Sequence, residues 1–243
     1  MKLSNQTILI TGGTSGIGLA LGKALRKKGN QVILLGRNKE KLAAASSLGF
    51  ETISCDFNQI ADIEAASVLI QNKYPQLSML FNNAGIQYNY HFSEQVIPPH
   101  KIVNEMQVNV SGQIILTQLL IPVLSNAKQA WIINTTSGLG MHPKKDGLVY
   151  SASKAAMRNF TKGLGAALKK SAIKVLEFIP PVTDTPMTAG RDENMMSVPR
   201  LIDLILPQIE RERRLITVPK IRLFEWIAFL FPSLADRILS KGD

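Results

Sequence analysis

Short apolar runs rich in Ile, Val and Leu recur at regular intervals along the chain, with little alternation of polar residues inside them. This pattern is typical of parallel β-strands that are covered on both faces, because neither face then needs polar side chains. We expect strands in six such segments: Thr7–Ile10, Gln31–Leu35, Glu51–Ser54, Met79–Phe81, Ala130–Asn134 and Lys174–Ile179.

Longer segments with helical periodicity separate these runs, namely Gly16–Lys28, Ile60–Lys73, Lys101–Leu124 and Ser151–Lys169. Alternation of strand and helix implies right-handed crossovers and a sheet with helices on both faces. No internal repeat and no linker rich in Pro, Gly or Ser divides the chain. The sequence therefore predicts one α/β domain over residues 1–243, a doubly wound parallel sheet of about seven strands of Rossmann type.

The composition of the chain bears on its core, its disulfides and its metal sites. The chain has 243 residues, of which 45% are hydrophobic, so it can bury a sizeable core. Its one cysteine, Cys55, excludes an intramolecular disulfide and any zinc site built on several thiolates. His91, His100 and His142 show no metal-ligand spacing, so we expect no metal. The first residues lack the apolar core of a signal peptide, and we expect a cytoplasmic protein.

The formal net charge of +10 invites a nucleic-acid or anionic-membrane function. The distribution of this charge argues otherwise, because residues 1–50 hold eight basic side chains and one acidic one. Lys23, Arg26, Lys27 and Lys28 fall in one helical stretch, where a solvated helix face is the simplest interpretation. We expect no nucleic-acid partner.

The first apolar run leads directly into the loop Thr11-Gly12-Gly13-Thr14-Ser15-Gly16-Ile17-Gly18 and then into a helix. Glycines permit a tight turn and close approach of the backbone to a phosphate, which the helix N-terminus also attracts. A purely structural turn is the less favoured alternative. We expect this loop to bind phosphate through Gly12, Thr14, Ser15, Gly16, Ile17 and Gly18.

A second constellation lies in the later half of the chain. Tyr150 and Lys154 stand one helical turn apart and therefore share a face, and Ser137 lies thirteen residues before the tyrosine. Asn109 stands in an Asn-Val-Ser-Gly segment further upstream. With the glycine loop and Asn82-Asn83-Ala84-Gly85, this pattern resembles the classical short-chain dehydrogenase/reductase family, in its NADP-preferring type.

The resemblance implies that Asn109, Ser137, Tyr150 and Lys154 form a catalytic tetrad. Tyr150 would be the general acid or base, but a free phenol has a pKa near 10. The Lys154 ammonium would lower that pKa and hold the nicotinamide ribose. Ser137 would donate a hydrogen bond to the substrate carbonyl oxygen, and Asn109 would anchor a water that links Lys154 to solvent.

The resemblance also assigns further cofactor contacts. Asp56, next to Phe57, would accept a hydrogen bond from the adenine amino group, although a helix cap explains such an aspartate equally well. The segment after the sixth strand departs from the family pattern, with Pro181 in place of a glycine and Thr183 where valine is common. The full set of these expected contacts is Asp56, Phe57, Asn83, Ala84, Gly85, Tyr150, Lys154, Pro180, Thr183 and Thr185.

The end of the second strand bears on the choice of dinucleotide. An acidic residue there would bind the ribose hydroxyls of NAD, but the chain has Gly36 followed by Arg37. A guanidinium suits a 2′-phosphate, which a carboxylate would repel. We therefore expect NADP(H) rather than NAD(H). Ser15 departs from the pattern, because related NADP-type enzymes often carry a basic residue at its position.

Three variable stretches are expected to wall the substrate pocket: Ile86–Lys101, Leu139–Val149 and Thr188–Leu201. Within residues 186–200, Gly190 and the polar run Arg191-Asp192-Glu193-Asn194 suggest a mobile lid. An apolar ketone or aldehyde, with its alcohol, is the substrate class we expect. The resemblance also implies a homodimer or homotetramer built on the helices Lys101–Leu124 and Ser151–Lys169.

The apolar tail 220–243 breaks the strand–helix rhythm. We expect it to dock on its own domain or on a second subunit, with a pocket wall or a peripheral membrane contact as less favoured alternatives. Its net charge of only +1 argues against a basic membrane anchor, and it is too short to span a bilayer. The tail and the Pro180-Pro181 turn resemble a DltE-like bacterial subgroup.

Two functions of other classes remain open at this stage. One is a catalytically silent NADP(H)-binding scaffold or redox sensor of the same fold. The intact set Asn109, Ser137, Tyr150 and Lys154 argues against it, because a scaffold does not need these residues. The other is a protein whose main task lies on nucleic acid or at an anionic membrane, for which the total charge is the argument.

Overall fold

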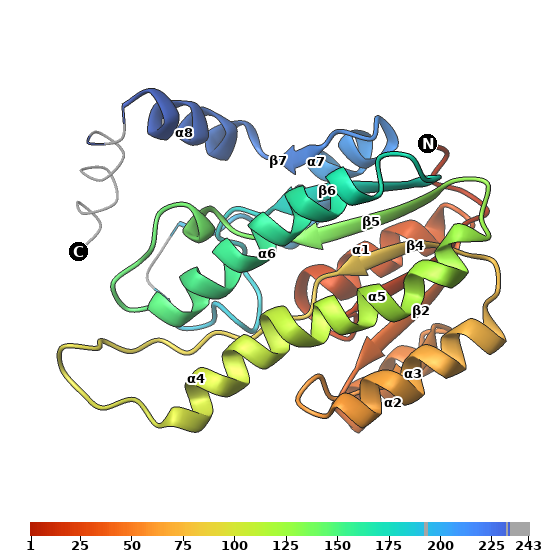
Figure 1. The fold of residues 1–243 in the computed structure, drawn as a ribbon, viewed down its shortest axis with the longest axis horizontal. Coiled ribbons are helices and arrows are strands. Elements are labelled where there is room, and N and C mark those ends of the chain that lie inside the picture. The colour runs from red at the N-terminus through yellow and green to blue at the C-terminus, as the bar shows by residue number, and fades with distance from the viewer. Residues whose placement is uncertain (192–193, 232, 234–243) are drawn as a thin grey trace.

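Seven parallel strands form one sheet in the order β3-β2-β1-β4-β5-β6-β7 (Figure 1). The structure is a computed structural model, and it describes residues 1–191, 194–231 and 233. The strands are β1 Thr7–Thr11, β2 Gln31–Gly36, β3 Glu51–Ser54, β4 Leu77–Asn82, β5 Ala130–Thr135, β6 Ile173–Ile179 and β7 Leu215–Thr217.

The predicted fold class is confirmed, and the six predicted strands appear with bounds within two residues of those expected. The seventh strand, β7, was not located from the sequence. It has only three residues, too few to show a periodicity, and its pairing with the carboxyl half of β6 defines it. Glu177 pairs with Leu215, and Ile179 pairs with Thr217.

Eight α-helices are assigned among the described residues, and the helices α1 and α3 closely match the predicted segments. The predicted helix Lys101–Leu124 is instead three pieces, because a π-helical turn at Gln107–Ser111 separates α4 from α5. The helices are α1 Gly16–Lys27, α2 Lys39–Ser47, α3 Ile60–Lys73, α4 Pro99–Met106, α5 Gly112–Ser125, α6 Leu148–Ala167, α7 Val198–Glu210 and α8 Pro219–Leu230.

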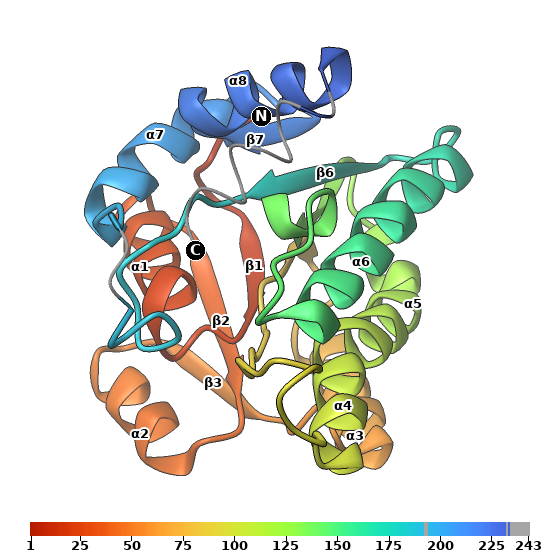
Figure 2. The same ribbon diagram turned by 90° about the vertical axis from the view of Figure 1, so that its left-hand side faces the viewer.

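Helices cover both faces of the sheet (Figure 2). Residues of β1 alternate between the faces, with Ile8 and Ile10 in the core beneath α1, α2 and α7, and Leu9 in the core beneath α3 and α5. All three side chains are fully buried. Burial of each such side chain contributes about 1.5–3 kcal/mol, so these two apolar layers supply most of the drive for folding.

The continuous helical run Pro99–Ser125 is long and apolar enough to cross a membrane by length and composition alone. Its second half nevertheless packs against the sheet, with Leu116, Leu120 and Leu124 fully buried. The more economical interpretation is a core helix that covers β4 and β5.

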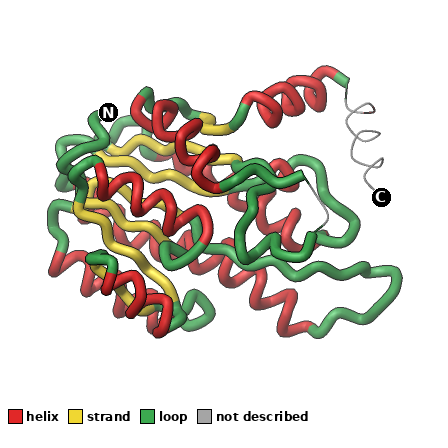
Figure 3. Tube along the Cα trace, turned by 180° about the vertical axis from the view of Figure 1, so that it is seen from behind, coloured by secondary structure: helices red, strands yellow, loops and turns green. Residues whose placement is uncertain are grey.

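Strands β2 and β3 lie on one side of β1, and strands β4 to β7 lie on its other side. The strand order therefore reverses between β1 and β4. All strands run in the same direction, so their carboxyl ends meet at one edge of the sheet. Figure 3 shows the sheet from behind, with its strands in yellow. In open α/β sheets, ligands bind at this edge beside the reversal point. The candidate residues Gly12, Arg37, Asp56, Asn83 and Ser137 each follow a strand end there.

Candidate active site

The loop between β1 and α1 depends on its glycines. Gly12 and Gly16 have φ angles of +61° and +51°, in the left-handed region that other residues adopt at a cost. Gly18 allows the helix to approach the strand, since a Cβ there would lie 2.4 Å from the Gly12 carbonyl oxygen. The loop is therefore held in a compact conformation that side chains at these positions would block.

The N-terminus of α1 has the properties of an anion site. Ser15 is the N-cap residue, and its side chain makes no capping hydrogen bond to the helix. The first turn carries no acidic residue, so nothing opposes the positive end of the helix dipole. Thr14 packs against Gly36, where a Cβ would lie 3.1 Å from its side chain. The glycine loop and the N-terminus of α1 therefore lie next to the end of β2. The properties of this loop and helix end fit the phosphates of a dinucleotide.

Thr11, which the motif includes but to which no role was assigned, ties β1 to the loop after β4. Its hydroxyl oxygen accepts hydrogen bonds from the backbone N–H groups of Asn83 and Ala84, both at 2.9 Å. The Asn83 side chain donates back to the Thr11 carbonyl at 3.1 Å. Gln113 of α5 donates to the Ala84 carbonyl at 2.7 Å. These bonds hold residues 83–85 beside the glycine loop, as expected for residues that share a ligand.

Arg37 and Asp56 lie together at the ends of β2 and β3. An Arg37 guanidinium nitrogen is 3.7 Å from a carboxylate oxygen of Asp56, and the Arg37 side chain is 54% exposed. Phe57 behaves differently, because its side chain is buried in the core and its carbonyl accepts a hydrogen bond from Gln107 at 3.0 Å. The structure therefore does not bring the Phe57 side chain to the site.

Lys154 is buried beneath the tyrosine on α6. Its ammonium donates a 3.0 Å hydrogen bond to the Thr135 carbonyl at the end of β5 and lies 5.5 Å from the centre of the Tyr150 ring. Burial lowers the pKa of Lys154 from its ordinary 10.5 to about 8. Among the described residues, no carboxylate offsets the lost hydration of Lys154, so the positive charge of this lysine is held at a cost.

Tyr150 lies close enough to Ser137 for the serine hydroxyl to affect the pKa of the phenol. Burial raises the pKa of Tyr150 to about 12, and the nearby Glu105 carboxylate adds to this rise. The Arg191 guanidinium and the Ser137 hydroxyl act in the opposite direction on the same pKa. Without a cofactor, the phenol is thus a weak acid that keeps its proton at neutral pH.

Asn109 lies in the π-helical turn between α4 and α5. Its side chain amide accepts from the Ile86 backbone N–H at 2.8 Å and donates to the Ile86 carbonyl at 2.9 Å and the Ser153 hydroxyl at 3.1 Å. A Cβ on Gly85 would lie 3.4 Å from the Asn109 amide oxygen and 3.7 Å from the Lys154 nitrogen. The structure thereby brings the loop after β4, Asn109 and Lys154 together.

The segment after β6 is braced by Thr188, which sequence reasoning missed. The Thr188 hydroxyl donates to the Thr183 carbonyl at 2.6 Å and accepts from the Thr185 backbone N–H at 3.0 Å. Thr183 is buried, whereas Thr185 faces the glycine loop, because a Cβ on Gly16 would lie 3.3 Å from its side chain. Thr185 therefore lies where the resemblance places a cofactor contact.

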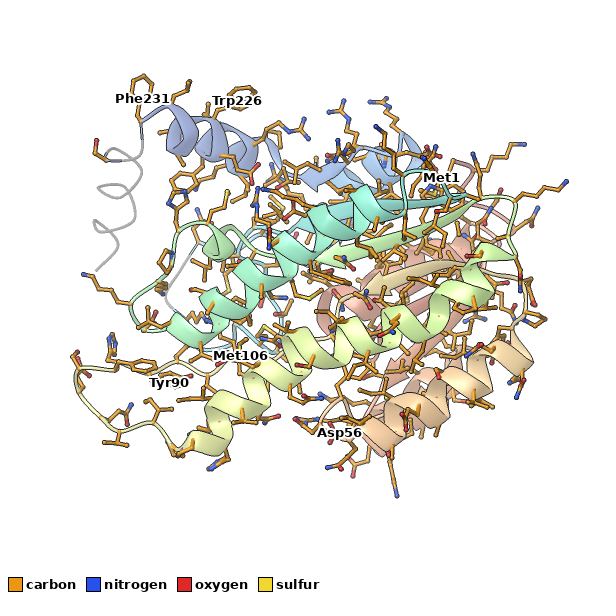
Figure 4. All side chains as sticks on the ribbon, in the orientation of Figure 1. Met1, Asp56, Tyr90, Met106, Trp226 and Phe231 are labelled. Atoms are coloured by element: carbon orange, nitrogen blue, oxygen red, sulfur yellow. The ribbon has the colours of Figure 1, made fainter. Side chains whose placement is uncertain are left out.

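A buried carboxyl group, Glu105, holds the loop between β4 and α4. It accepts hydrogen bonds from the Tyr88 backbone N–H at 3.2 Å and from the Tyr90 hydroxyl at 3.3 Å. Tyr90 lies in the loop before α4, near Met106 (Figure 4). Burial raises the pKa of Glu105 above its ordinary value. A lone glutamate on an expected helix gave no signal of this role in the sequence.

The expected lid, residues 186–200, is in part ordered structure. Thr183 pairs with Met196 in a parallel bridge, and Val198 begins α7. Arg191 donates to the Gln87 side chain at 2.8 Å, which links this segment to the loop after β4. Asp192 and Glu193 lie outside the described residues, and the mobility of the segment stays a prediction. Among the residues that the structure describes, no cluster of three or more His, Cys, Asp or Glu side chains could hold a metal.

Comparison with known proteins agrees with this geometry. The family model for short chain dehydrogenases matches residues 6–196. The chain is 37% identical over 187 residues to a protein described as the uncharacterized oxidoreductase DltE of Bacillus subtilis (strain 168), covering 76% of this chain and 74% of that protein. A doubly wound fold with this site defines a class of oxidoreductases, and the chain belongs to the short chain dehydrogenase family within it. The predicted resemblance, including that to DltE, is confirmed.

Solved structures share the fold over nearly the whole chain. A short chain dehydrogenase from Burkholderia cenocepacia J2315, in complex with NADP, superposes with a TM-score of 0.87 at 22% identity and covers 98% of this chain and 99% of its own. One from Sphingobium yanoikuyae, in complex with NADPH, has a TM-score of 0.82 at 26% identity and covers 97% and 95%.

Proposed function

We propose that this protein is an NADP(H)-dependent oxidoreductase that transfers a hydride between the nicotinamide and a carbonyl or alcohol substrate, with Tyr150 as the general acid or base. The observation that carries this proposal is the joint placement of three side chains. The Ser137 hydroxyl lies close enough to Tyr150 to lower the pKa of the phenol, and the Lys154 ammonium lies 5.5 Å from the tyrosine ring at the edge of the sheet beside the glycine loop.

Two observations support NADP(H) as the cofactor. The end of β2 carries Gly36 and Arg37 and no carboxylate that would repel a 2′-phosphate. The structurally similar dehydrogenases from Burkholderia and Sphingobium are complexes with NADP and NADPH. The glycine loop and the uncapped N-terminus of α1 would hold the pyrophosphate, and Arg37 the 2′-phosphate, with Asp56 next to the adenine.

The bound cofactor supplies a hydride donor or acceptor at the nicotinamide ring. In carbonyl reduction, Ser137 donates a hydrogen bond to the substrate oxygen, and Tyr150 gives its proton to that oxygen as negative charge develops there. Lys154 binds the nicotinamide ribose, and its positive charge favours the phenolate that Tyr150 becomes. In alcohol oxidation, the Tyr150 phenolate takes the hydroxyl proton. Asn109 holds the neighbouring backbone at Ile86 in place.

The remaining assignments belong to the same proposal. The substrate is a small apolar ketone or aldehyde, or its alcohol, bound between the segments 86–101, 139–149 and 188–201. The protein works in the cytoplasm as a homodimer or homotetramer, with α5 and α6 at the interface between copies. The segment 186–200 orders over the bound substrate.

A panel of carbonyls and alcohols with both dinucleotides, followed by absorbance of the reduced nicotinamide, tests the proposal. Tyr150→Phe is expected to lower turnover by about 10²–10⁴-fold, the range that general acid–base catalysis supplies, while NADPH affinity stays within a few-fold. Tyr74→Phe is the matched control, because it also removes a tyrosine hydroxyl, one that bonds to Glu51 at the far end of β3. Unchanged turnover in Tyr150→Phe contradicts the mechanism, and tight NADPH binding without turnover of any substrate indicates a silent scaffold.

A further inference from the structure

Helix α8 contacts its own domain along one face. Glu225 accepts a 3.0 Å hydrogen bond from the Arg158 guanidinium on α6, and Phe224 packs edge-to-face on His142, with ring centres 5.2 Å apart. Ala228 is buried on the same side. The expectation that the tail docks on its own domain therefore holds for this face, within the described part of the tail.

The opposite face of α8 exposes large apolar side chains. Leu223, Trp226, Leu230 and Phe231 are each between 58% and 62% exposed, and the first three are spaced as one stripe along a helix. Trp226 and Phe231 point away from the body of the molecule (Figure 4). Contiguous exposed apolar surface of this kind indicates an interaction site.

The segment that contains this stripe is rich in basic residues. Residues 211–230 contain five basic and two acidic residues, and both acids are neutralised within the domain. Glu225 pairs with Arg158, and Glu212 pairs with Lys174 and the N-terminal ammonium. The basic residues are Arg211, Arg213, Arg214, Lys220 and Arg222.

A groove of about 470 Å³ lies beside α8 and combines both kinds of side chain. Apolar walls come from Leu204 of α7 and from Leu223 and Trp226 of α8, and Arg213 and Arg222 also line it. Arg222 is held by hydrogen bonds to the Gln208 side chain and the Leu215 carbonyl, both at 3.3 Å. The groove thus offers an apolar surface next to fixed positive charge.

We propose that the outer face of α8 and this groove bind the surface of an anionic lipid bilayer. An amphipathic helix with aromatic and aliphatic residues on one side and basic residues at its flanks lies in the membrane interface, where the cations meet acidic headgroups. The charge favours this occupant over a second copy of the chain, because two copies of the same positive surface repel each other. The exposed leucines favour it over nucleic acid, because bases stack on an aromatic ring such as that of Trp226 but offer nothing comparable to the aliphatic side chains Leu223 and Leu230.

The net charge of the tail alone pointed away from a membrane, and the structure explains the difference. The sum counts Glu225, which is turned inward onto Arg158, and it omits Arg213, which lies before the tail but lines the groove beside α8. The inference does not rest on the proposed function. It does bear on access to the site, because His142, which contacts Phe224, belongs to the loop that follows Ser137.

Tryptophan fluorescence gives a direct test with the full chain. The protein has two tryptophans, of which Trp131 is 3% exposed in β5 and Trp226 is 61% exposed on α8. In Trp131→Phe, emission reports α8 alone. We expect vesicles of phosphatidylcholine with phosphatidylglycerol to shift the Trp226 emission to shorter wavelength and to carry the protein into the pellet. Vesicles of phosphatidylcholine alone are expected to have much less effect.

Variants separate the apolar and the charged contributions. In the Trp131→Phe background, Leu223→Gln with Leu230→Gln is expected to weaken partitioning into anionic vesicles at least tenfold. Arg213→Glu is expected to weaken it about fivefold or more. Leu48→Gln with Val68→Gln, which changes two exposed apolar residues on other surfaces, is the matched control and should partition normally.

Three results would overturn the proposal. The first is no emission shift and no pelleting with anionic vesicles. The second is equal partitioning into neutral and anionic vesicles. The third is an emission shift that appears without vesicles and grows with protein concentration, accompanied by a larger mass in light scattering. If Leu223→Gln reduces that mass, the result assigns this face of α8 to a second copy of the chain. Circular dichroism of each variant shows whether the fold is intact, and the Arg213→Glu variant provides the test should the double glutamine variant not fold.

Discussion

The guanidinium of Arg37 lies 3.7 Å from the carboxylate of Asp56 at the carboxyl ends of β2 and β3. The sequence assigned these residues to two different parts of the cofactor, the 2′-phosphate and the adenine. Their pairing keeps Arg37 near the strand edge while leaving more than half of its side chain exposed. An exposed ion pair of this kind is worth at most about 1 kcal/mol, so a phosphate can displace the carboxylate easily.

Arg37→Asp is therefore expected to reverse the preference for the phosphorylated dinucleotide. A charge-assisted hydrogen bond is worth about 1.5–3 kcal/mol, so NADPH affinity should fall at least about tenfold while NADH affinity changes little. Titration calorimetry with both dinucleotides measures the ratio. Lys23→Asp makes the same charge change at an exposed position of α1 and tests general electrostatic attraction. A variant at Arg37 that still prefers NADPH contradicts the assignment.

The lowered pKa of Lys154 makes a prediction about stability and pH. The folded protein loses a proton near pH 8, whereas the unfolded chain keeps it until about 10.5. The unfolded state thus binds more protons in this window, so the contribution of Lys154 to the free energy of unfolding rises with pH, by about 2 kcal/mol between pH 8 and 10. Lys154→Met should lack this rise.

Urea unfolding of the cofactor-free protein at pH 8 and 10 measures the effect as a difference between wild type and Lys154→Met. The difference is needed because other groups titrate in the same range. Burial raises the pKa of Cys55 to about 12, which lowers stability as pH increases above the ordinary value of the thiol. This opposing contribution is common to both proteins. An identical pH dependence in the two proteins would show that Lys154 is not destabilised by burial.

The glycine loop gives a prediction with an internal control. Gly18→Ala is expected to abolish tight dinucleotide binding and to destabilise the fold, because its Cβ would lie 2.4 Å from the Gly12 carbonyl oxygen. Gly163→Ala, within α6, meets no atom within 4 Å and should instead raise the free energy of unfolding by about 0.5–1 kcal/mol. Thermal unfolding and NADPH titration of both variants check the contrast. Equal behaviour of the two alanine variants would mean that the loop is not closely packed.

Local residue patterns were enough to predict the positions of six of the seven strands and the glycine loop between β1 and α1. They also singled out Ser137, Tyr150 and Lys154, whose catalytic roles stay a prediction. Contacts between distant segments were not predictable in the same way. The π-helical turn at Gln107–Ser111 is an example, because it inserts into an otherwise regular helical pattern and is seen only in the backbone. It is this turn that carries Asn109, whose amide bonds to Ile86.

Pairings that depend on tertiary structure were equally hidden from the sequence. Thr188 resembles any threonine of a polar loop, yet its hydroxyl joins Thr183 to Thr185. Short elements such as β7 have too few residues for a periodicity. The orientation of Glu225 toward Arg158 could not be read from the summed charge of the tail. In each case the missing information is which distant residue the side chain meets.

Glu105 is the residue of the site whose role the sequence least suggested, and its buried carboxyl makes a further prediction. Its pKa is raised by burial, so the folded protein holds this proton more tightly than the unfolded chain. The contribution of Glu105 to stability is therefore complete at pH values below the ordinary glutamate pKa, and it is lost as pH rises through the folded pKa. Between pH 4.5 and 7, the free energy of unfolding should fall less in Glu105→Gln than in the wild-type protein.

Glu105→Ala tests the hydrogen bonds separately from the charge. It leaves the Tyr88 backbone N–H and the Tyr90 hydroxyl without their acceptor, which should cost about 1–3 kcal/mol of stability at all pH values. Turnover should fall as well, because these tyrosines belong to the expected substrate wall. Glu64→Gln, at an exposed position of α3, is the control and should change neither quantity. Urea unfolding at pH 4.5 and 7 measures the stability, and absorbance of the reduced nicotinamide measures the turnover. An alanine variant as stable as wild type would show that the carboxyl does not organise this wall.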